Sequence, residues 1–339
     1  MRRTLRSTNH AKTINTLFSA PATVTDMVFL QKMRQNVTLS LSHLLCHTVT
    51  FCLFRNLLWY NRPMQLKKHL FLCAVTVIFA SAGCRPNVSR TEWPVMGTIA
   101  ALQTRTSSAS DANMRARVQE IFEKIEYLLN AHDKNSELSR LAPLDEEEIL
   151  RRCSPVVRPC YETAFRLAKE SGGAFNPRWR GEKTLDLGAI AKGFAVDLAA
   201  DALSGSQQAI LVDLGGNIKA VSTSKSSAGS WQSGVRAIDG SGIAARLTLE
   251  PGEALATSAK YFRGKHIYDP RSGHPVENGV ASVTVLCPSA MLADALSTTL
   301  FVMSPEEGLK FLKEKKYQAS VLFIMDDGRY ISNDGRFLY

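Results

Sequence analysis

Cysteine is scarce in the part of the chain that we expect to fold, where Cys153, Cys160 and Cys287 are the only ones after Cys84. Their spacing matches no pattern typical of a zinc site, and nothing in it indicates thiol catalysis. Cys153 and Cys160 could form a disulfide in an oxidising compartment, which would leave Cys287 single inside a predicted strand. Internal repeats are missing as well, so we expect no repeat architecture.

Acidic residues are nearly missing from the beginning of the chain. Residues 1–63 contain eight Lys or Arg residues and a single acid, Asp26, and Lys67 and Lys68 increase the excess. The net charge of +10 over 339 residues therefore leaves about +1 for everything from Cys84 onward. The high pI belongs to the leader, and no basic patch is interleaved with aromatic residues. We therefore expect no nucleic acid partner.

Residues 64–83 have the order of a secretory signal. A basic start at Lys67 and Lys68 precedes an apolar core of roughly ten residues and then small residues. The sequence Ser-Ala-Gly-Cys at 81–84 resembles a bacterial lipobox, although Ser81 stands where Leu is usual. We expect Cys84 to be lipidated and to anchor the protein in the cell envelope, facing the periplasm. An uncleaved membrane anchor and a plain signal peptide are the alternatives.

This interpretation divides the chain into four segments. Met64 is the expected initiator, so residues 1–63 would be an upstream extension or a leader. If they are translated, residues 37–60 could form a weakly amphipathic or membrane-associated segment. Residues 64–83 are the predicted signal, 84–90 a tether, and 91–339 one domain.

Hydrophobic periodicity predicts both helices and strands in residues 91–339. We expect helices at 112–130, 161–171, 190–203, 289–303 and 305–315, and a short helical turn within 133–142. We expect strands at 91–103 with a turn at 96–98, and at 209–214, 280–287, 319–325, 330–331 and 337–338, and a brief extended segment at 184–187. Residues 231–238, 244–249 and 255–258 are predicted as strands of an antiparallel sheet. The fold class is α+β, with a mixed or antiparallel sheet and flanking helices.

Asp294 is the only charged residue between Ser289 and Met303. The apolar residues around it predict a helix packed over most of its surface, where a carboxylate must be paired, hydrogen-bonded or bound to a metal. Thr298 lies one turn further on the same face, so two oxygen side chains could hold a hard cation such as Mg²⁺. The alternative is a structural carboxylate held by a basic side chain or a backbone amide, which is the more common case.

Three other segments combine glycines or polar side chains at turns. Asp186–Gly193 (DLGAIAKG) places a glycine turn at the start of a helix, where free amides and the helix dipole favour a phosphate. Leu211–Asn217 (LVDLGGN) ends a strand in glycines, which let a ligand approach the backbone. His266–Gly273 (HIYDPRSG) gathers His, Tyr, Asp and Arg in one turn. Each segment also has a purely structural explanation. The first could be an ordinary glycine-containing helix start, the second a tight turn, and the third a turn with a hydrogen-bonded histidine.

In this order the segments resemble the bacterial FAD:protein FMN transferase family, the ApbE family. The resemblance extends from about Glu92 to Tyr330. It is carried by VMGT at 95–98, NSELSRL at 135–141, LDLGAIAKGFAVD at 185–197, LVDLGGNI at 211–218, HIYDPRSGHPV at 266–276 and SVTVLCPSAMLADALSTTLFV at 282–302. A lipoprotein signal is also common in that family.

The resemblance implies a Mg²⁺-dependent enzyme that splits the pyrophosphate of FAD. Such an enzyme attaches FMN through its phosphate to a Ser or Thr hydroxyl of an acceptor, a membrane-associated respiratory flavoprotein, and releases AMP. The resemblance places the metal on Asp294, Thr298 and the backbone carbonyl of Ala189. The catalytic residues that it implies are Asp294 and His266, and His266 is the candidate general base. The positions that it implies for FAD binding are Met96, His132, Asp186, Lys192, Gly215, Gly216 and Tyr268.

Several positions depart from the family pattern. Asn176 stands where many relatives have Asp, and a short link follows it in place of a long insertion. His132 replaces a frequent aromatic residue, Ala259 replaces the Gly of Thr-Ser-Gly, and Ser297 stands where some relatives supply a further acidic ligand. The metal helix and the DLG loop are intact, so the resemblance implies binding of FAD and Mg²⁺, but it does not define the flavin-ring pocket or the acceptor specificity. An FAD-binding accessory lipoprotein and an enzyme that hydrolyses FAD to FMN and AMP are the alternative functions.

Overall fold

The computed structural model describes residues 88–105, 110–223, 229–260 and 267–339, all of which belong to one unit, Pro86–Tyr339. The predicted leader and signal and most of the predicted tether lie outside these residues, as does His266. Within the described residues, no helix has the length and apolar character needed to cross a membrane.

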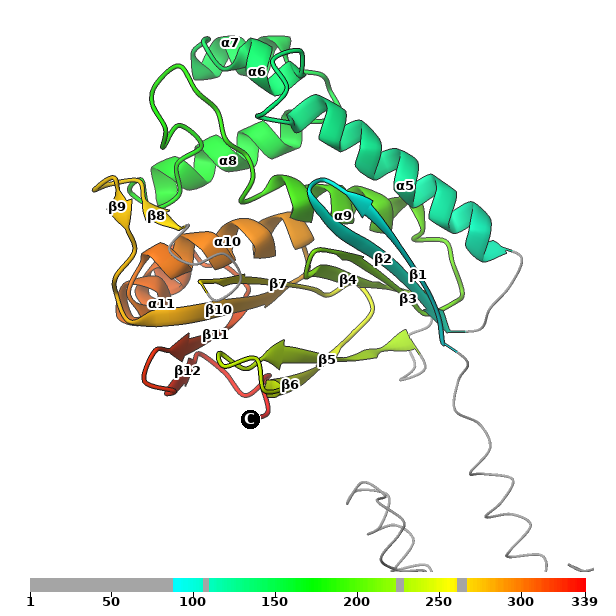
Figure 1. Ribbon diagram of the computed structural model, residues 1–339. Coiled ribbons are helices and arrows are strands. Elements are labelled where there is room, and N and C mark those ends of the chain that lie inside the picture. The colour runs from blue at the N-terminus through cyan, green and yellow to red at the C-terminus, as the bar shows by residue number, and fades with distance from the viewer. Residues whose placement is uncertain (1–87, 106–109, 224–228, 261–266) are drawn as a thin grey trace, which may run out of the picture. The chain divides into compact units, whose positions relative to one another are not determined.

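An antiparallel sheet forms the framework of the described residues (Figure 1). It has eight strands in the order β1-β2-β3-β4-β7-β10-β11-β12, and each neighbouring pair is antiparallel. Its strands are β1 (Val88–Val95), β2 (Thr98–Arg105), β3 (Ile210–Leu214), β4 (Asn217–Val221), β7 (Ala254–Ala259), β10 (Val280–Cys287), β11 (Ser320–Met325) and β12 (Tyr330–Ser332). Two separate hairpins are formed by β5 (Trp231–Arg236) with β6 (Ile243–Leu249), and by β8 (Tyr268–Asp269) with β9 (His274–Pro275).

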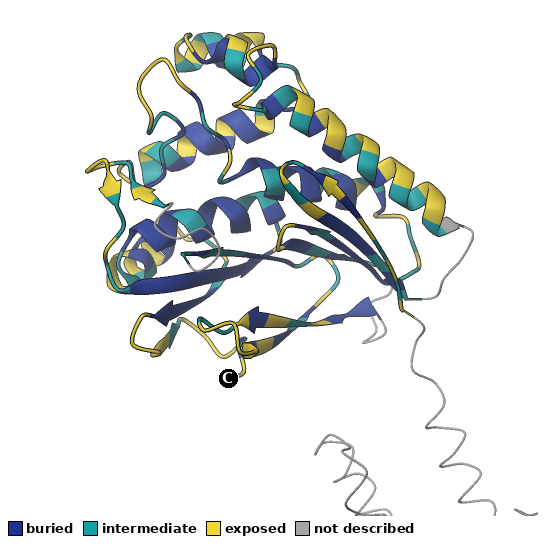
Figure 2. Cartoon of the chain, in the orientation of Figure 1, coloured by how far each residue is buried: buried dark blue, intermediate teal, exposed yellow. Residues whose placement is uncertain are grey.

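Helices cover one face of this sheet, and the β5–β6 hairpin lies on the other side (Figure 1). The helices are α5 (Ser110–Leu129), α6 (Glu137–Leu141), α7 (Glu146–Arg152), α8 (Arg158–Glu170), α9 (Ala191–Ala202), α10 (Ala290–Val302) and α11 (Pro305–Glu314). α10 packs on β7 and β10, and α9 packs on α10, α5 and β4. In Figure 2 both α9 and α10 are buried along most of their length.

Strand β10 is buried at all eight of its positions because both faces of the sheet are covered there. Its alternating side chains serve two cores: Val283 and Val285 belong to the core under the helices, and Leu286 to the core under the β5–β6 hairpin. A continuous apolar run of this kind is expected of a strand that is covered on both faces. The helix that carries Asp294 therefore follows the most deeply buried strand of the sheet directly.

The predicted fold class, α+β with an antiparallel sheet and flanking helices, is confirmed. Three details of the prediction were wrong. Residues 231–238 and 244–249 pair with each other in a separate hairpin, and 255–258 alone joins the main sheet. Leu338 makes an isolated bridge to Arg246 instead of belonging to a strand. Cys153 and Cys160 are buried free thiols, so the disulfide does not form.

Candidate functional site

The candidate site is built on a close crossing of helices α9 and α10, which Gly193 makes possible. A Cβ atom at this glycine would lie 2.1 Å from the carbonyl oxygen of Ala290 and 2.7 Å from the Cβ of Asp294. No other residue type fits at such a distance, so the two backbones touch here. The crossing brings the start of α9, which follows the DLG loop, against the middle of α10.

Asp294 occupies the crossing point and is 6% exposed. Its Oδ2 accepts a hydrogen bond of 2.9 Å from the Gly193 amide and lies 3.8 Å from the Lys192 Nζ. Burial raises the pKa of the carboxyl, and the Lys192 charge and the Gly193 amide oppose this shift. Among the described residues no hydrogen bond reaches Oδ1. The carboxylate is thus partly compensated by the protein and has one oxygen left for a ligand.

The backbone carbonyl of Ala189 lies just before α9, which begins at Ala191 with Ile190 as its N-cap. The amide of Gly193 is in the first turn of the helix and has no partner within it. That amide donates to Asp294 instead, and no other donor among the described residues reaches the Ala189 carbonyl. One side-chain oxygen and one backbone oxygen are therefore left without donors at the start of α9.

Thr298 belongs to a group of hydroxyls between α10 and β7. Its Oγ1 lies 3.0 Å from the Ser258 Oγ, which is also 2.8 Å from the Ser297 Oγ. Ser297 is fully buried and donates to the carbonyl of Asp294 at 2.9 Å. These contacts fix the Thr298 rotamer one turn from Asp294, as the helical spacing predicts.

Among the described residues no group of three or more His, Cys, Asp and Glu side chains could hold a metal ion. A cation at this crossing would instead be held by a carboxylate, a hydroxyl and a backbone carbonyl. All three are oxygen donors, which hard cations such as Mg²⁺ prefer, and substrate phosphates commonly complete such sites. The donors present therefore fit Mg²⁺ and do not fit zinc.

Asp186, in the loop before α9, organises an aromatic group. Its Oδ1 accepts from the Gly188 amide at 2.8 Å, and its Oδ2 accepts from the Trp179 indole nitrogen at 3.1 Å. Trp179 stacks on Tyr268 with a centroid separation of 5.5 Å, and the Arg180 guanidinium lies 4.6 Å from the indole centroid. The structure thus joins two predicted FAD positions, Asp186 and Tyr268, through Trp179 in the shortened link.

The predicted glycine turn after β3 packs against the turn between β1 and β2. Gly215 has φ +62°, its amide donates to the Ile99 carbonyl at 3.1 Å, and an added Cβ would lie 2.5 Å from the Thr98 Oγ1. Met96 has φ +50° in the neighbouring turn, and Gly216 has φ +90°. The two strands that the Gly215-Gly216 turn joins, β3 and β4, both pack against α9.

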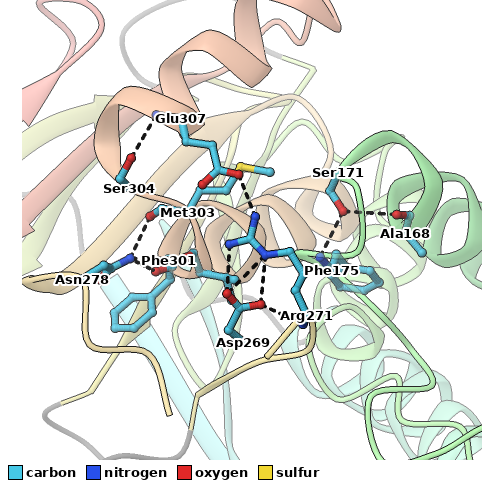
Figure 3. Close-up of polar contacts among 11 residues, drawn as sticks. Ala168, Ser171, Phe175, Asp269, Arg271, Asn278, Phe301, Met303, Ser304 and Glu307 are labelled. Atoms are coloured by element: carbon cyan, nitrogen blue, oxygen red, sulfur yellow. Dashed lines mark hydrogen bonds and ion pairs between the residues drawn. The ribbon is translucent and has the colours of Figure 1, made fainter. Parts of the chain in front are cut away.

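The turn that follows His266 is held by an arginine network (Figure 3). Arg271 forms ion pairs with Asp269 at 2.9 Å and with Glu307 of α11 at 2.8 Å. Its side chain also lies against Gly173 at the end of α8, 3.6 Å from the position of an added Cβ. The network fixes the β8–β9 hairpin, and with it Tyr268, on α11 and on the turn that follows α8.

Two predicted residues are not tied to this arrangement. His266 lies outside the described residues, so its position relative to Asp294 stays a prediction. His132 is exposed in the loop between α5 and α6, and the hydrogen bonds of that loop are local. Gly193 and Asp197 both lie in the DLGAIAKGFAVD segment, but no local pattern in the sequence marks either of them individually. Asp197 accepts hydrogen bonds from the start of α10.

Comparison with known proteins places these features in one family. The model of the ApbE family matches residues 96–182 and 179–323 of the chain. The chain is 34% identical over 157 residues to the FAD:protein FMN transferase of Vibrio cholerae serotype O1, a match that covers 43% of this chain and 47% of the relative. It is 37% identical over 153 residues to the FAD:protein FMN transferase of Rhodobacter capsulatus, covering 42% of this chain and 28% of the relative. The matches therefore span less than half the length of these curated relatives.

Solved structures agree on the fold over a longer stretch. The flavin transferase ApbE from Vibrio cholerae superposes with a TM-score of 0.61 at 26% identity, covering 73% of this chain and 97% of that chain. The apo form of the flavinyl transferase ApbE from Pseudomonas stutzeri gives a TM-score of 0.58 at 23% identity, covering 73% of this chain and 94% of that chain. The second similarity shows the fold alone.

Proposed function

This chain belongs to the ApbE family, and we propose that it transfers the FMN part of FAD to a Ser or Thr hydroxyl of an acceptor protein. The observation that carries the proposal is the pair of oxygens without donors at the crossing of α9 and α10. The Asp294 carboxylate lies 3.8 Å from the Lys192 Nζ, and the Ala189 carbonyl comes just before the start of α9. Such a place suits a cation and a pyrophosphate together.

The names of the relatives support the same reaction. The curated relatives are FAD:protein FMN transferases, and the Vibrio cholerae structure is a flavin transferase. The part of the chain that the family model matches includes the residues at the helix crossing. The aromatic stack of Trp179 on Tyr268, hydrogen-bonded to Asp186, gives a planar surface beside the crossing for a ring of the dinucleotide.

The residues of the chain have distinct tasks in this reaction. The acceptor oxygen forms a bond to the FMN phosphorus, and the bond from that phosphorus to the AMP oxygen breaks, so AMP leaves. Lys192 is placed to bind a pyrophosphate oxygen, since its Nζ already lies at the site with one hydrogen bond of 2.7 Å to the Gly188 carbonyl. His266 is the proposed base that takes the proton of the acceptor hydroxyl.

Asp294, Thr298 and the Ala189 carbonyl would hold Mg²⁺ in this proposal. Bound there, Mg²⁺ would neutralise charge on the pyrophosphate and stabilise the charge that develops during phosphoryl transfer. Asp294 is suited to holding a cation because its carboxylate is buried and only partly compensated by Lys192. Ser258 and Ser297 would keep the Thr298 hydroxyl in place.

The proposal is tested by incubating the purified chain with FAD, Mg²⁺ and a candidate acceptor domain. Chromatography follows AMP and FMN, and intact-protein mass spectrometry follows an FMN adduct on the acceptor. The matched control is the same acceptor with its Ser or Thr replaced by Ala. We expect AMP release and an adduct with the first acceptor alone.

The two alternative functions give different products in this assay. AMP and free FMN without an adduct would show an FAD hydrolase and would refute the transferase. FAD that binds and is recovered intact, with Mg²⁺ present, would indicate an accessory FAD-binding protein. An acceptor without a hydroxyl that still became flavinylated would refute the proposed chemistry of attachment.

We also propose that the protein is exported and anchored by lipid at Cys84, facing the periplasm. The proposal rests on the signal-like order of residues 64–83 and on the lipobox-like sequence before Cys84. Such a location would bring the site to membrane-associated flavoprotein acceptors. Metabolic labelling with a fatty acid tests it: we expect labelling of the wild-type protein and none of Cys84→Ser.

A further inference from the structure

Asp197 connects the two helices of the site at a second point, one turn beyond Gly193 on α9. Its Oδ2 accepts from the Ser289 hydroxyl at 2.7 Å and from the Met291 amide at 2.9 Å. Its Oδ1 accepts from the Ala290 amide at 2.9 Å. These donors belong to the first turn of α10, whose amides have no partner within the helix. A carboxylate on one helix therefore caps the other.

The same carboxylate also holds strand β4. Lys219 of β4 places its Nζ 2.7 Å from the Asp197 Oδ1, and both side chains are largely buried, with exposures of 14% and 16%. Four donors thus converge on two carboxylate oxygens, which have about four acceptor sites in total. Asp197 has no remaining acceptor site for a metal or a substrate. It can act on the site through the elements that it joins.

The two contacts between the helices lie one turn apart on each helix. On α9 they involve Gly193 and Asp197, four residues apart, and on α10 they involve the start of the helix and Asp294. Sliding α10 by one residue would move Asp294 by about 1.5 Å, which is enough to break its hydrogen bond with Gly193. The contacts of Asp197 at the first turn of α10 oppose that movement.

We propose that Asp197 is a positioning residue for the cation site, fixing α10 on α9 so that Asp294 is held beside Gly193, Lys192 and the Ala189 carbonyl. This inference rests on the proposed function for the identity of the cation. The alternative is that Asp197 contributes to the stability of the fold alone. The two differ in one respect: a positioning residue changes the affinity for the cation, whereas a stabilising residue changes the unfolding temperature alone.

The test uses Asp197→Asn in the full chain, with Mn²⁺ as the probe for the cation. Free Mn²⁺ is measured by electron paramagnetic resonance during titration in the presence of FAD. We expect binding to weaken about tenfold or more, as is typical when a residue that orients metal ligands is changed. The matched control is Asp145→Asn, because Asp145 caps α7 through the Glu148 amide at 2.8 Å and that helix carries no site residue. Its Mn²⁺ affinity should equal that of the wild type.

A second variant, Asp197→Glu, tests whether the position of the carboxylate matters when its charge is kept. It also replaces the Asn variant if that variant does not fold. Glutamate keeps the charge but adds one methylene, so it displaces the start of α10. The positioning role predicts weaker Mn²⁺ binding for this variant too. If the folded variants bound Mn²⁺ with an affinity within about twofold of the wild type, the inference would be overturned. Changing a residue that orients metal ligands usually weakens metal binding at least tenfold.

Hydrogen exchange at the Gly193 amide gives a second measurement without any ligand. This amide donates to Asp294, so loosening α10 in Asp197→Asn should speed its exchange relative to wild type and to Asp145→Asn. A wild-type protein that binds neither FAD nor Mn²⁺ would refute the proposed function. In that event faster exchange at Gly193 would support the positioning of Asp294 by Asp197, and unchanged exchange would overturn it.

Discussion

Replacing Gly193 with alanine would force apart the two helices that form the site. The new Cβ would lie 2.1 Å from the Ala290 oxygen and 2.6 Å from its carbonyl carbon, where ordinary contact begins at 3.4 Å. The obstructing atoms are backbone, so no rotamer change can relieve the overlap. α10 would have to move by roughly 1 Å, and the hydrogen bond from the Gly193 amide to Asp294 would be lost.

The expected cost of Gly193→Ala follows from three contributions. Overpacking a well-packed interior costs about 1–3 kcal/mol. Losing a hydrogen bond to a charged group costs about 1.5–3 kcal/mol. Alanine is more favourable than glycine inside a helix, which should raise the free energy of unfolding by about 1 kcal/mol. The free energy of unfolding should therefore fall by about 1.5–5 kcal/mol, and FAD-dependent AMP release should be lost even where the protein is folded.

Urea denaturation measures the stability, and chromatography of AMP measures the activity under conditions where the variant is folded. Gly205→Ala is the matched control, because no atom lies within 4 Å of an added Cβ there and its φ is not positive. It should be neutral or slightly stabilising. If Gly193→Ala were as stable and as active as Gly205→Ala, the contact between the backbones of α9 and α10 would be refuted.

Three other substitutions test separate parts of the site. Asp294→Asn should abolish AMP release. Its free energy of unfolding without Mg²⁺ should be at least as high as that of the wild type, because the substitution removes a buried and partly compensated charge. Turnover in this variant would contradict the assignment of Asp294 as a metal ligand. Arg271→Ala should lower the free energy of unfolding by about 1 kcal/mol and slow transfer, because it removes the ion pairs with Asp269 and Glu307. Arg329→Ala should change neither, because it breaks only the exposed pair with Asp327, which has the same sequence spacing as Arg271 and Asp269. Gly215→Ala should lower the free energy of unfolding by about 1 kcal/mol more than Gly216→Ala, because an added Cβ would overlap a threonine hydroxyl at Gly215 alone. Equal losses of stability in urea denaturation would refute that overlap.

The sequence predicts most long elements because their periodicity is strong. Strand β10 and helix α10 are both recognisable, the first as an unbroken apolar run and the second by its apolar residues around Asp294. Helix α7 was missed because its seven residues, EEEILRR, are mostly charged and show little periodicity. Strand β4 was missed because it begins directly after Gly215-Gly216, which mark the end of β3 in sequence.

The contacts of the site could be predicted in part. The helical spacing of Asp294 and Thr298 places them one turn apart, and the glycine-rich start of α9 is visible in the sequence. The role of Gly193 depends on a backbone 97 residues further along, at Ala290. Asp197 likewise acts on amides that follow it by more than ninety residues. No local pattern carries such information, because it arises only when the two helices cross.

The burial of β10 on both faces has a consequence for how the site moves. Its amides should exchange with solvent among the slowest in the protein, and α10 follows it after two residues, so the helix crossing belongs to the part that opens last. The β8–β9 hairpin is two residues a side, largely exposed, and held by the ion pairs of Arg271. It should open orders of magnitude more often than the crossing. The helix crossing would then stay intact while the hairpin that carries Tyr268 opens and closes.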